Sequence, residues 1–431
     1  MIPPAKTTIL PNGVKITTIE SAESESVAIG FFARTGSRCE PAALCGHSHF
    51  LEHMLFKGSS KRGARQISQA IEGRGGRCNA ATGAESTYYY AVMPADSAAL
   101  ALDVIGDAYL RPTLAEKDVD SERGVIMEEL NSSRDTPDDY VFDLAQSALW
   151  KGHPLGAQIL GTPKTLEAVR SATLRDYHAS RYHAGSTVIA AAGAISHEKF
   201  AKMAAPYALA LPATGKTGFK AATAKTPLIA LSADSRETEQ VNAVMAYRTD
   251  FGNNDDRRYA LRILSVVLGE NMSSRLFQTV REKHGMAYSV SSTSSLYSDT
   301  GDFQIYAGLD RRRSAKGLAL CAAEVAKILR EPVGKAEFAR ALRYVIGGIK
   351  MSCETTTSRM WHAGMEALFD KTEPPEERIA RYARLTPDEV LAVAAEIFRP
   401  EKMALALVLP RENADSPETH LAAAAVAGSA K

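Results

Sequence analysis

Several features of specialised proteins are scarce in this chain. Its 431 residues include only five cysteines, an odd number without a Cys-x-x-Cys pair, so we expect no disulfide framework and favour a reducing compartment. No apolar run is long enough to cross a membrane as a helix. The amino terminus lacks the charged segment, apolar core and cleavage site of a signal peptide. We therefore expect a cytoplasmic protein with no membrane partner.

An excess of charge of either sign is also missing. The chain has 51 basic and 50 acidic residues, which give a net charge of +1 and no bulk attraction for nucleic acid. Its 45% hydrophobic and 23% charged residues are typical of globular domains. This length is enough for two or three domains, each with its own core.

The predicted elements fall into two similar halves, each with strands, helices and a strand pair in the same order. The repeat has a period near 210 residues, and it is visible in the pattern rather than in residue identity. It rests on strands expected at 27–33, 186–192, 241–247 and 403–409, and on helices at 47–56, 97–109, 257–268 and 315–329. We therefore predict an α+β fold with two similar domains of about 200 residues, each a mainly antiparallel sheet with helices on one face.

Composition suggests where the halves meet. Residues 211–228 are poor in large apolar side chains and contain Gly and Pro, which is typical of a linker. The predicted boundaries are thus an N-terminal domain at 1–210 and a C-terminal domain at 229–411. We expect the alanine-rich tail at 412–431 to be disordered.

The most informative motif is His49-Phe-Leu-Glu52-His53. On a helix, positions i, i+3 and i+4 place all three polar side chains on one face. Two imidazoles one turn apart can bind a single zinc ion, and the carboxylate between them can take a proton from a water on that ion. His-x-x-Glu-His is a known metallopeptidase signature. The alternative is a helix that carries two surface histidines by chance.

A catalytic zinc usually has a third protein ligand. Residues 115–131 have the pattern of a helix, on which Glu122 and Glu129 lie two turns apart on the same side, whereas Glu128 points about 100° away. From the pattern alone, each of these acids could equally be a solvated surface charge.

The run from Gly46 to Gly58 resembles the zinc helix of the pitrilysin-like (M16) metallopeptidases, and most closely the branch of the mitochondrial processing peptidase and its bacterial relatives. That resemblance implies one zinc ion per chain and a glutamate as third ligand, which falls on Glu129, 76 residues after His53. It implies that Glu122 orients a ligand and that Glu52 is the general base. The expected two-domain unit covers nearly the whole chain.

Two further segments extend the resemblance. Residues 76–90 look like the family's active-site edge strand and the strand after it, so Asn79, Ala80 and Thr82 are expected to bind the main chain of a peptide. Without the resemblance, an ordinary hairpin is the simpler interpretation. Residues 274–288 resemble a second catalytic element, in which Arg281 and Tyr288 bind substrate and stabilise the tetrahedral intermediate.

Specificity residues are predicted less sharply. Asp139 and Asp143 are expected on one helix face, where acids of the processing peptidase bind a basic residue before the cleaved bond, and Phe56 matches its apolar pocket after the bond. Two solvated aspartates explain the same pattern. His47, where the family usually has an apolar residue, is expected on the surface at the start of the helix.

The predicted function is a zinc-dependent endopeptidase that cleaves peptides or unfolded segments inside a clam-shell chamber. The resemblance implies that two such two-domain chains build the chamber. A homodimer with two composite sites is the economical assembly, and a heterodimer with a related chain is the alternative. A non-catalytic core subunit, or the peptide-binding half of a hetero-oligomeric peptidase, is the alternative function.

Overall fold

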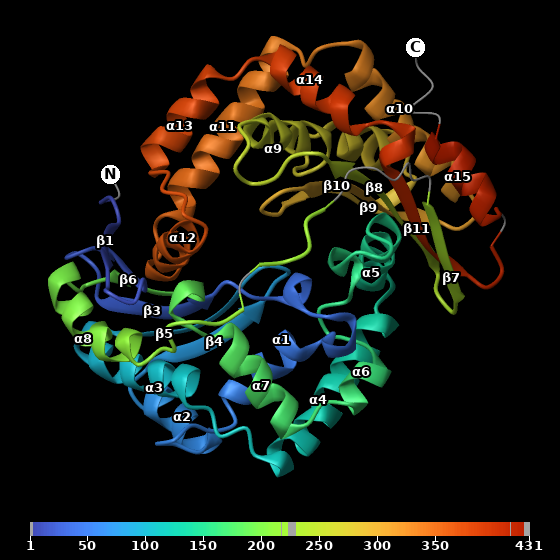
Figure 1. Cartoon of the computed structure of the whole chain (residues 1–431). Coiled ribbons are helices and arrows are strands. Elements are labelled where there is room, and N and C mark those ends of the chain that lie inside the picture. Colours follow the sequence, from blue (N-terminus) through green and yellow to red (C-terminus); the bar gives the residue numbers. More distant parts are fainter. Residues whose placement is uncertain (1–2, 217, 223–229, 414, 426–431) are drawn as a thin grey trace. The chain divides into compact units, whose positions relative to one another are not determined.

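The structure, a computed structural model, describes residues 3–216, 218–222, 230–413 and 415–425. The chain forms two compact units, and neither is one continuous stretch (Figure 1). Unit 1 comprises Met1–Leu130, Ala157–Lys220 and Ile349–Glu377. Unit 2 comprises Asn131–Gly156, Ala221–Gly348 and Arg378–Lys431.

Unit 1 is built on a six-stranded sheet with the order β1-β2-β6-β3-β5-β4. All neighbours are antiparallel except β2 and β6, which are parallel. The last strand, β4, pairs only with β5 and so forms an edge of the sheet among the described residues. The strands are β1 (Lys6–Ile9), β2 (Lys15–Glu20), β3 (Ser26–Ala33), β4 (Arg77–Thr82), β5 (Thr87–Pro94) and β6 (Thr187–Gly193).

Unit 2 repeats this sheet with five strands in the order β7-β11-β8-β10-β9. Leaving out β1, each strand has a counterpart in the same position, including the one parallel pair, β7 and β11. β5 begins at Thr87 and β10 at Gly301, which are 214 residues apart, close to the expected period. Two similar α+β domains are therefore present. The strands are β7 (Ala230–Arg236), β8 (Gln240–Thr249), β9 (Ala287–Leu296), β10 (Gly301–Asp310) and β11 (Met403–Pro410).

Helices cover both faces of the unit 1 sheet, and not one face as we expected. Alternate residues of a strand point to opposite faces, and nearly all of β3 is apolar and buried. Val27, Ile29 and Phe31 pack in a core with α1, α2, α3, α7 and α8. Ala28 and Phe32 pack in a second core with α12, which contacts β6, β3 and β2 and is seen next to β3 and β6 in Figure 1.

Helix α12 is the counterpart of α5, and the two are exchanged between the units. Helix α12 comes from the second half of the sequence and packs on the first sheet, whereas α5 comes from the first half and packs on β11, β8 and β7. The helices are α1 (His47–Leu55), α2 (Ala64–Glu72), α3 (Ala98–Leu110), α4 (Glu116–Asp135), α5 (Pro137–Leu149), α6 (Pro163–Glu167), α7 (Ser171–Arg181), α8 (His197–Leu209), α9 (Arg257–Leu268), α10 (Ser314–Arg330), α11 (Lys335–Ser352), α12 (Thr356–Leu368), α13 (Pro375–Arg384), α14 (Pro387–Ile397) and α15 (Pro417–Ala425).

The exchange makes the units differ from the continuous domains expected at 1–210 and 229–411. Residues 131–156 belong with the second sheet, and residues 349–377 belong with the first. A hydrophobic pattern identifies a helix, but it does not say which sheet the helix covers. Of the expected linker at 211–228, residues 217 and 223–228 lie outside the described residues, and the remainder has no helix or strand.

The prediction of a disordered tail is wrong for residues 417–425. Helix α15 packs against α10 and the strands β7 and β11. Ser416 accepts a hydrogen bond from the backbone N–H of Thr419, so it caps the start of the helix. His420 is fully buried and bonds Ser314 Oγ and the Ser416 carbonyl oxygen, both at 2.8 Å. Residues 414 and 426–431 of the predicted tail lie outside the described residues.

Candidate metal centre

Helix α1 presents the motif from a largely buried position. Its residues Phe50, Leu51, Met54 and Leu55 belong to the unit 1 core, which fixes the opposite side of the helix. Gly46 precedes the helix with φ +92°, a left-handed conformation that favours glycine. A Cβ there would also lie 2.9 Å from the Cα of Gly161.

The start of α1 is capped by a residue that the sequence analysis missed. The Glu40 carboxylate accepts hydrogen bonds from the backbone N–H of Gly46, at 2.8 Å, and of Ser48, at 2.6 Å. A negative charge at a helix N-terminus is stabilised by the helix dipole. Burial nevertheless raises the pKa of Glu40 to about 7. Glu40 lies too far from the helix in sequence to match a capping pattern, so no local signal identifies it.

The structure brings His49, His53 and Glu129 together. Glu129 comes from α4, and its two carboxylate oxygens lie 3.7 Å from His49 Nε2 and 3.5 Å from His53 Nε2. One donor atom from each of the three residues lies within 4.8 Å of the others, and the described residues contain no other such group of three. Glu128 is exposed on the same helix.

These distances fit a bound zinc ion. Bonds of about 2.0–2.2 Å in a tetrahedral arrangement place neighbouring donor atoms roughly 3.3–3.6 Å apart. The observed 3.5 and 3.7 Å run to the two different oxygens of Glu129; they are close to that spacing and too long for good hydrogen bonds. One donor atom from each residue lies within 4.8 Å of the other two, so a single ion can reach all three. Burial lowers the pKa of His49 to about 4, with a further contribution from His53, so His49 is neutral, as a ligand must be. The donor set therefore fits the metal.

Glu122 contacts one of the imidazoles. Its Oε1 lies 2.8 Å from His53 Nδ1, and its Oε2 pairs with Lys57 Nζ at 2.5 Å. A carboxylate can only accept here, so Nδ1 carries a proton, and Nε2, which lies 3.5 Å from Glu129 Oε2, is the ring nitrogen left to bind a metal. Glu122 is almost fully buried, whereas Glu129 is nearly half exposed. Glu122 thus lies against His53, and its contact with Lys57 is one that the sequence did not suggest.

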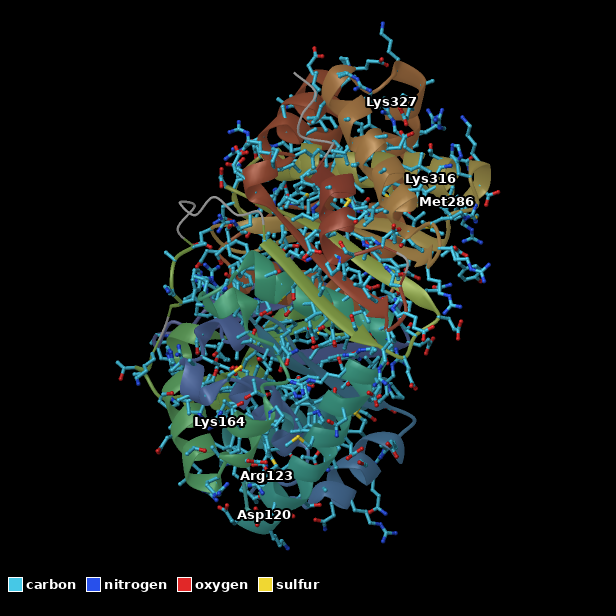
Figure 2. All side chains as sticks on the ribbon, turned by 90° about the vertical axis from the view of Figure 1, so that its right-hand side faces the viewer. Asp120, Arg123, Lys164, Met286, Lys316 and Lys327 are labelled. Atoms are coloured by element: carbon cyan, nitrogen blue, oxygen red, sulfur yellow. The ribbon has the colours of Figure 1, made fainter. Side chains whose placement is uncertain are left out.

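Helix α4 is anchored by Arg123, next to Glu122. The Arg123 guanidinium donates to the carbonyl oxygens of Leu166, at 3.2 Å, and Val169, at 2.8 Å. It also pairs with Asp120 at 2.8 Å, and Figure 2 shows these two labelled side chains together at the end of the unit. These bonds tie α4 to α6 and the residues after it, and so fix the helix that carries both acids.

Glu52 lies between the two histidines in sequence and bonds the edge strand. Thr82 Oγ1, at the end of β4, donates to Glu52 Oε2 at 2.6 Å. Burial raises the pKa of Glu52, and the Thr82 hydrogen bond and His53 partly oppose this rise. A carboxylate with a raised pKa and one fixed oxygen is suited to take up and release a proton.

The other residues predicted near the metal lie on or beside β4. Asn79 is exposed on this edge strand, and Ala80 and Thr82 are half-buried. Phe56 ends α1 and packs its ring 6.2 Å from that of Tyr89 in β5. In the described part of the chain, no strand pairs with the outer edge of β4, which leaves backbone groups that an extended peptide can bond.

His47 is buried, and the prediction of a surface position is wrong. It is 1% exposed, its Nε2 lies 3.3 Å from Thr173 Oγ1, and its ring packs against Tyr177. Burial lowers the pKa of His47, which favours the uncharged ring. The side chain faces α7 because the first turn of α1 is covered by that helix.

Arg281 and Tyr288 lie together in unit 2. Arg281 is in a π-helical turn, Phe277–Lys283, and its guanidinium carbon is 5.0 Å from the centre of the Tyr288 ring. Tyr288 is 75% exposed near the start of β9, the edge strand that corresponds to β4. π-Helical turns are rare and occur frequently at functional sites.

Asp139 and Asp143 also belong to unit 2. They lie on α5, which begins after the break at Thr136 that ends α4. Asp139 is exposed and, with Asp138, adds to the effect of burial that raises the pKa of Tyr306 to about 12. Asp143 is half-buried.

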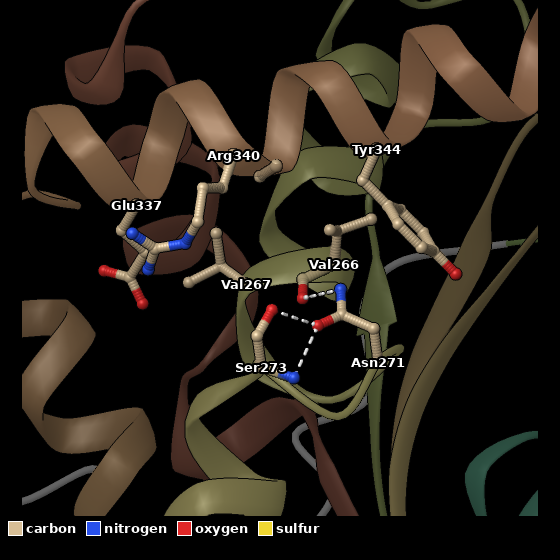
Figure 3. A pocket seen from close by; sticks show the side chains of 8 residues that line it. Val266, Val267, Asn271, Ser273, Glu337, Arg340 and Tyr344 are labelled. Carbon is tan, nitrogen blue, oxygen red and sulfur yellow. Dashed lines mark hydrogen bonds between the residues drawn. The ribbon is translucent and has the colours of Figure 1, made fainter.

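Unit 2 also contains a cavity of about 140 Å³ between α9, the loop after it and α11 (Figure 3). The loop residue Asn271 accepts hydrogen bonds from Ser273 and donates to the Val266 carbonyl oxygen. Glu337 forms a two-pronged ion pair with Arg275. These hydrogen bonds stabilise the loop. None of the predicted site residues is among the residues that line the cavity. The lining residues are Val266, Val267, Asn271, Ser273, Glu337, Arg340, Ala341 and Tyr344.

Comparison with known families identifies both halves. Residues 15–163 match the model of the insulinase family (peptidase family M16), and residues 168–345 match the peptidase M16 inactive domain. An uncharacterized zinc protease of Streptomyces coelicolor is 35% identical over 97% of this chain and 92% of its own length. The chain belongs to the M16 family. The uncharacterized zinc protease YmxG of Bacillus subtilis is 36% identical over 94% of this chain and 98% of its own length.

Solved M16-like structures share the fold. A protease from Helicobacter pylori superimposes with a TM-score of 0.89 at 17% identity, over 95% of this chain and all of that one. The peptidase M16 inactive domain from Pseudomonas fluorescens gives a TM-score of 0.87 at 20% identity, over 96% and 100% of the two chains. Among the described residues, no helix is both long and apolar enough to span a membrane.

Proposed function

We propose that this M16 chain is a zinc-dependent endopeptidase. The observation that carries the proposal is the cluster of His49, His53 and Glu129, with Glu52 on the same helix and bonded to the edge strand. The relatives named zinc proteases support it, because they match nearly the whole chain. The five free cysteines fit a reducing compartment such as the cytoplasm.

His49, His53 and Glu129 would hold the metal, one ion per chain. Zinc supplies a Lewis acid that lowers the pKa of a water to about 7 and polarises a carbonyl. Glu52 takes the proton of the attacking water and delivers it to the departing amine, as its raised pKa allows. Glu122 holds the proton on His53 Nδ1 throughout, so that Nε2 stays basic.

The substrate in this proposal is an extended peptide added to the free edge of β4 at Asn79, Ala80 and Thr82. Main-chain pairing accepts many sequences, which suits an endopeptidase for peptides or unfolded segments. Phe56 would line an apolar pocket after the cleaved bond. Asp139 and Asp143 would favour a basic residue before it.

Arg281 and Tyr288 would bind substrate, with the Tyr288 hydroxyl donating to the oxygen of the attacked carbonyl. Such a donor is worth about 3–4 kcal/mol in the transition state. We propose a homodimer enclosing a clam-shell chamber, in which each site takes its metal ligands from one copy and its Arg281 and Tyr288 from the other. Mixing a His49→Ala chain with a Tyr288→Phe chain should then restore activity at one of the two sites of each mixed dimer.

Hydrolysis of a mixed-sequence quenched peptide library tests the proposal. Wild type and Glu52→Gln are compared, with the zinc content of both measured. We expect about one zinc per chain in each protein and cleavage by wild type alone, because Glu52 is not a ligand. Zinc in both proteins with cleavage by neither would instead favour a peptide-binding half that needs a related chain.

A further inference from the structure

Arg38 is a fully buried charge outside the metal centre. Its side chain has no exposure to solvent, and its Nη1 pairs with Glu85 Oε1 at 2.5 Å. Its Nη2 donates to the carbonyl oxygen of Lys220 at 3.0 Å, and its guanidinium carbon lies 3.9 Å above the centre of the Phe219 ring. Burying a guanidinium costs free energy of desolvation, and these three partners are what offsets that cost.

Glu85 lies in the turn between β4 and β5, and this turn is also held through the backbone. The N–H groups of Ser37 and Arg38 donate to the carbonyl oxygens of Gly83, at 3.2 Å, and Ala84, at 2.9 Å. The two segments approach so closely that a Cβ on Gly36 would lie 2.2 Å from the Gly83 oxygen. Arg38 therefore fixes the turn by both its main chain and its side chain.

The same turn ends the strand that bonds Glu52. Thr82 is the last residue of β4, directly before Gly83, and its hydroxyl donates to Glu52. A shift of the turn would move that hydroxyl, because a single peptide unit separates Thr82 from Gly83. Few contacts separate the Arg38 guanidinium from Glu52: Arg38 binds the turn after β4, and Thr82 at the end of β4 binds Glu52. All of these residues lie within unit 1.

Phe219 and Lys220 end the middle stretch of unit 1, Ala157–Lys220, after which the chain passes to unit 2. The next stretch, Ala221–Gly348, belongs to unit 2, where the Ala222 N–H donates to Asp299 at 2.9 Å. Arg38 therefore contacts two segments, the turn between β4 and β5 and the residues Phe219 and Lys220.

We propose that Arg38 is a positioning residue that sets the place of Thr82, and through it Glu52, and that Phe219 and Lys220 hold Arg38 in this role. The assignment rests on the proposed peptidase function for its effect on catalysis. The guanidinium is needed because one planar group serves a carboxylate, a carbonyl oxygen and a ring face together. Lysine has a point charge and cannot make all three contacts.

Hydrogen exchange tests the structural half of this proposal without any catalysis. The variants are Arg38→Met, Phe219→Leu and the control Arg65→Met, which removes an exposed arginine of α2 in the same unit. We expect amide exchange in residues 80–88 to rise about tenfold in Arg38→Met and less in Phe219→Leu, with α4 and the zinc content unchanged. Unchanged exchange in residues 80–88 for both variants would overturn the proposal.

A double-mutant cycle tests the catalytic half. If Arg38 acts through the Thr82 hydroxyl, Arg38→Met lowers kcat about tenfold in the wild type but less than twofold in a Thr82→Val background. Arg38→Lys should recover little of the loss. Multiplicative losses in the double variant would refute the route through Thr82. If the wild type itself hydrolyses no peptide, the proposed function fails, and the exchange experiment still decides the role of Arg38.

Discussion

Replacing Glu122 by glutamine should weaken zinc binding without unfolding the protein. Glu122 is 3% exposed and joins His53 Nδ1 at 2.8 Å to the Lys57 ammonium. A glutamine oxygen can still accept from His53, but its amide then directs N–H donors at the Lys57 ammonium. The variant therefore loses a charge-assisted hydrogen bond, which is worth about 1.5–3 kcal/mol.

A neutral amide holds the His53 Nδ1–H less firmly than a carboxylate does, so we expect a tenfold to hundredfold weaker zinc affinity, which is about 1.4–2.8 kcal/mol at 1.4 kcal/mol for each factor of ten. Zinc dissociation constants can be measured by competition with a chromophoric chelator at fixed pH. The matched control is Glu128→Gln, which removes an exposed acid from the same helix and should change the constant less than twofold. An affinity of Glu122→Gln within threefold of wild type would refute the orienting role.

Three more predictions follow from buried polar groups. Burial raises the pKa of Asp302 to about 7, above its unfolded value near 3.9, so the wild type should lose stability as the pH rises from about 4 to 7. Asp302→Asn should therefore have a higher urea midpoint of unfolding than wild type at pH 8, and this difference in midpoint should be smaller at pH 5. A difference that does not depend on pH would contradict this. Glu40→Ala leaves two buried N–H groups of α1 without their acceptor and should lower stability by about 2–4 kcal/mol, measured by urea unfolding, whereas Glu40→Gln should lose less. His420→Ala should release α15, visible as faster hydrogen exchange in residues 417–425 with unchanged zinc content.

The sequence predicted helices and strands best where the apolar residues had a strong periodicity and the segment had clear start and stop signals. Helix α9 occupies the expected residues 257–268, and α1 ends one residue before its expected end. The three polar residues of the motif lie within five positions, so helical geometry alone puts them on one face. Glu129 is 76 residues away from His53, and only the family resemblance singled it out from the acids around it.

The sequence pattern did not predict contacts between different elements. Glu40, Lys57 and Arg38 have no periodic or spacing signal, because their partners lie on other elements. The place of α12 was missed for the same reason, although the unbroken apolar run at 27–33 already indicated a strand covered on both sides. For α15, the pair Ser416-Pro417 is typical of a helix start, but the alanine-rich composition of the tail favoured the prediction of disorder.

The exchange of α5 and α12 amounts to a reciprocal domain swap inside one chain. If the fold arose by duplication of a single half, each copy has given its partner the helix it would otherwise have kept. A fragment ending near Lys220 would lack α12 and leave Phe32 and its neighbours uncovered, at about 1.5–3 kcal/mol for each large apolar side chain. The two halves expressed separately should therefore be aggregation-prone alone, and should reassemble when they are produced together.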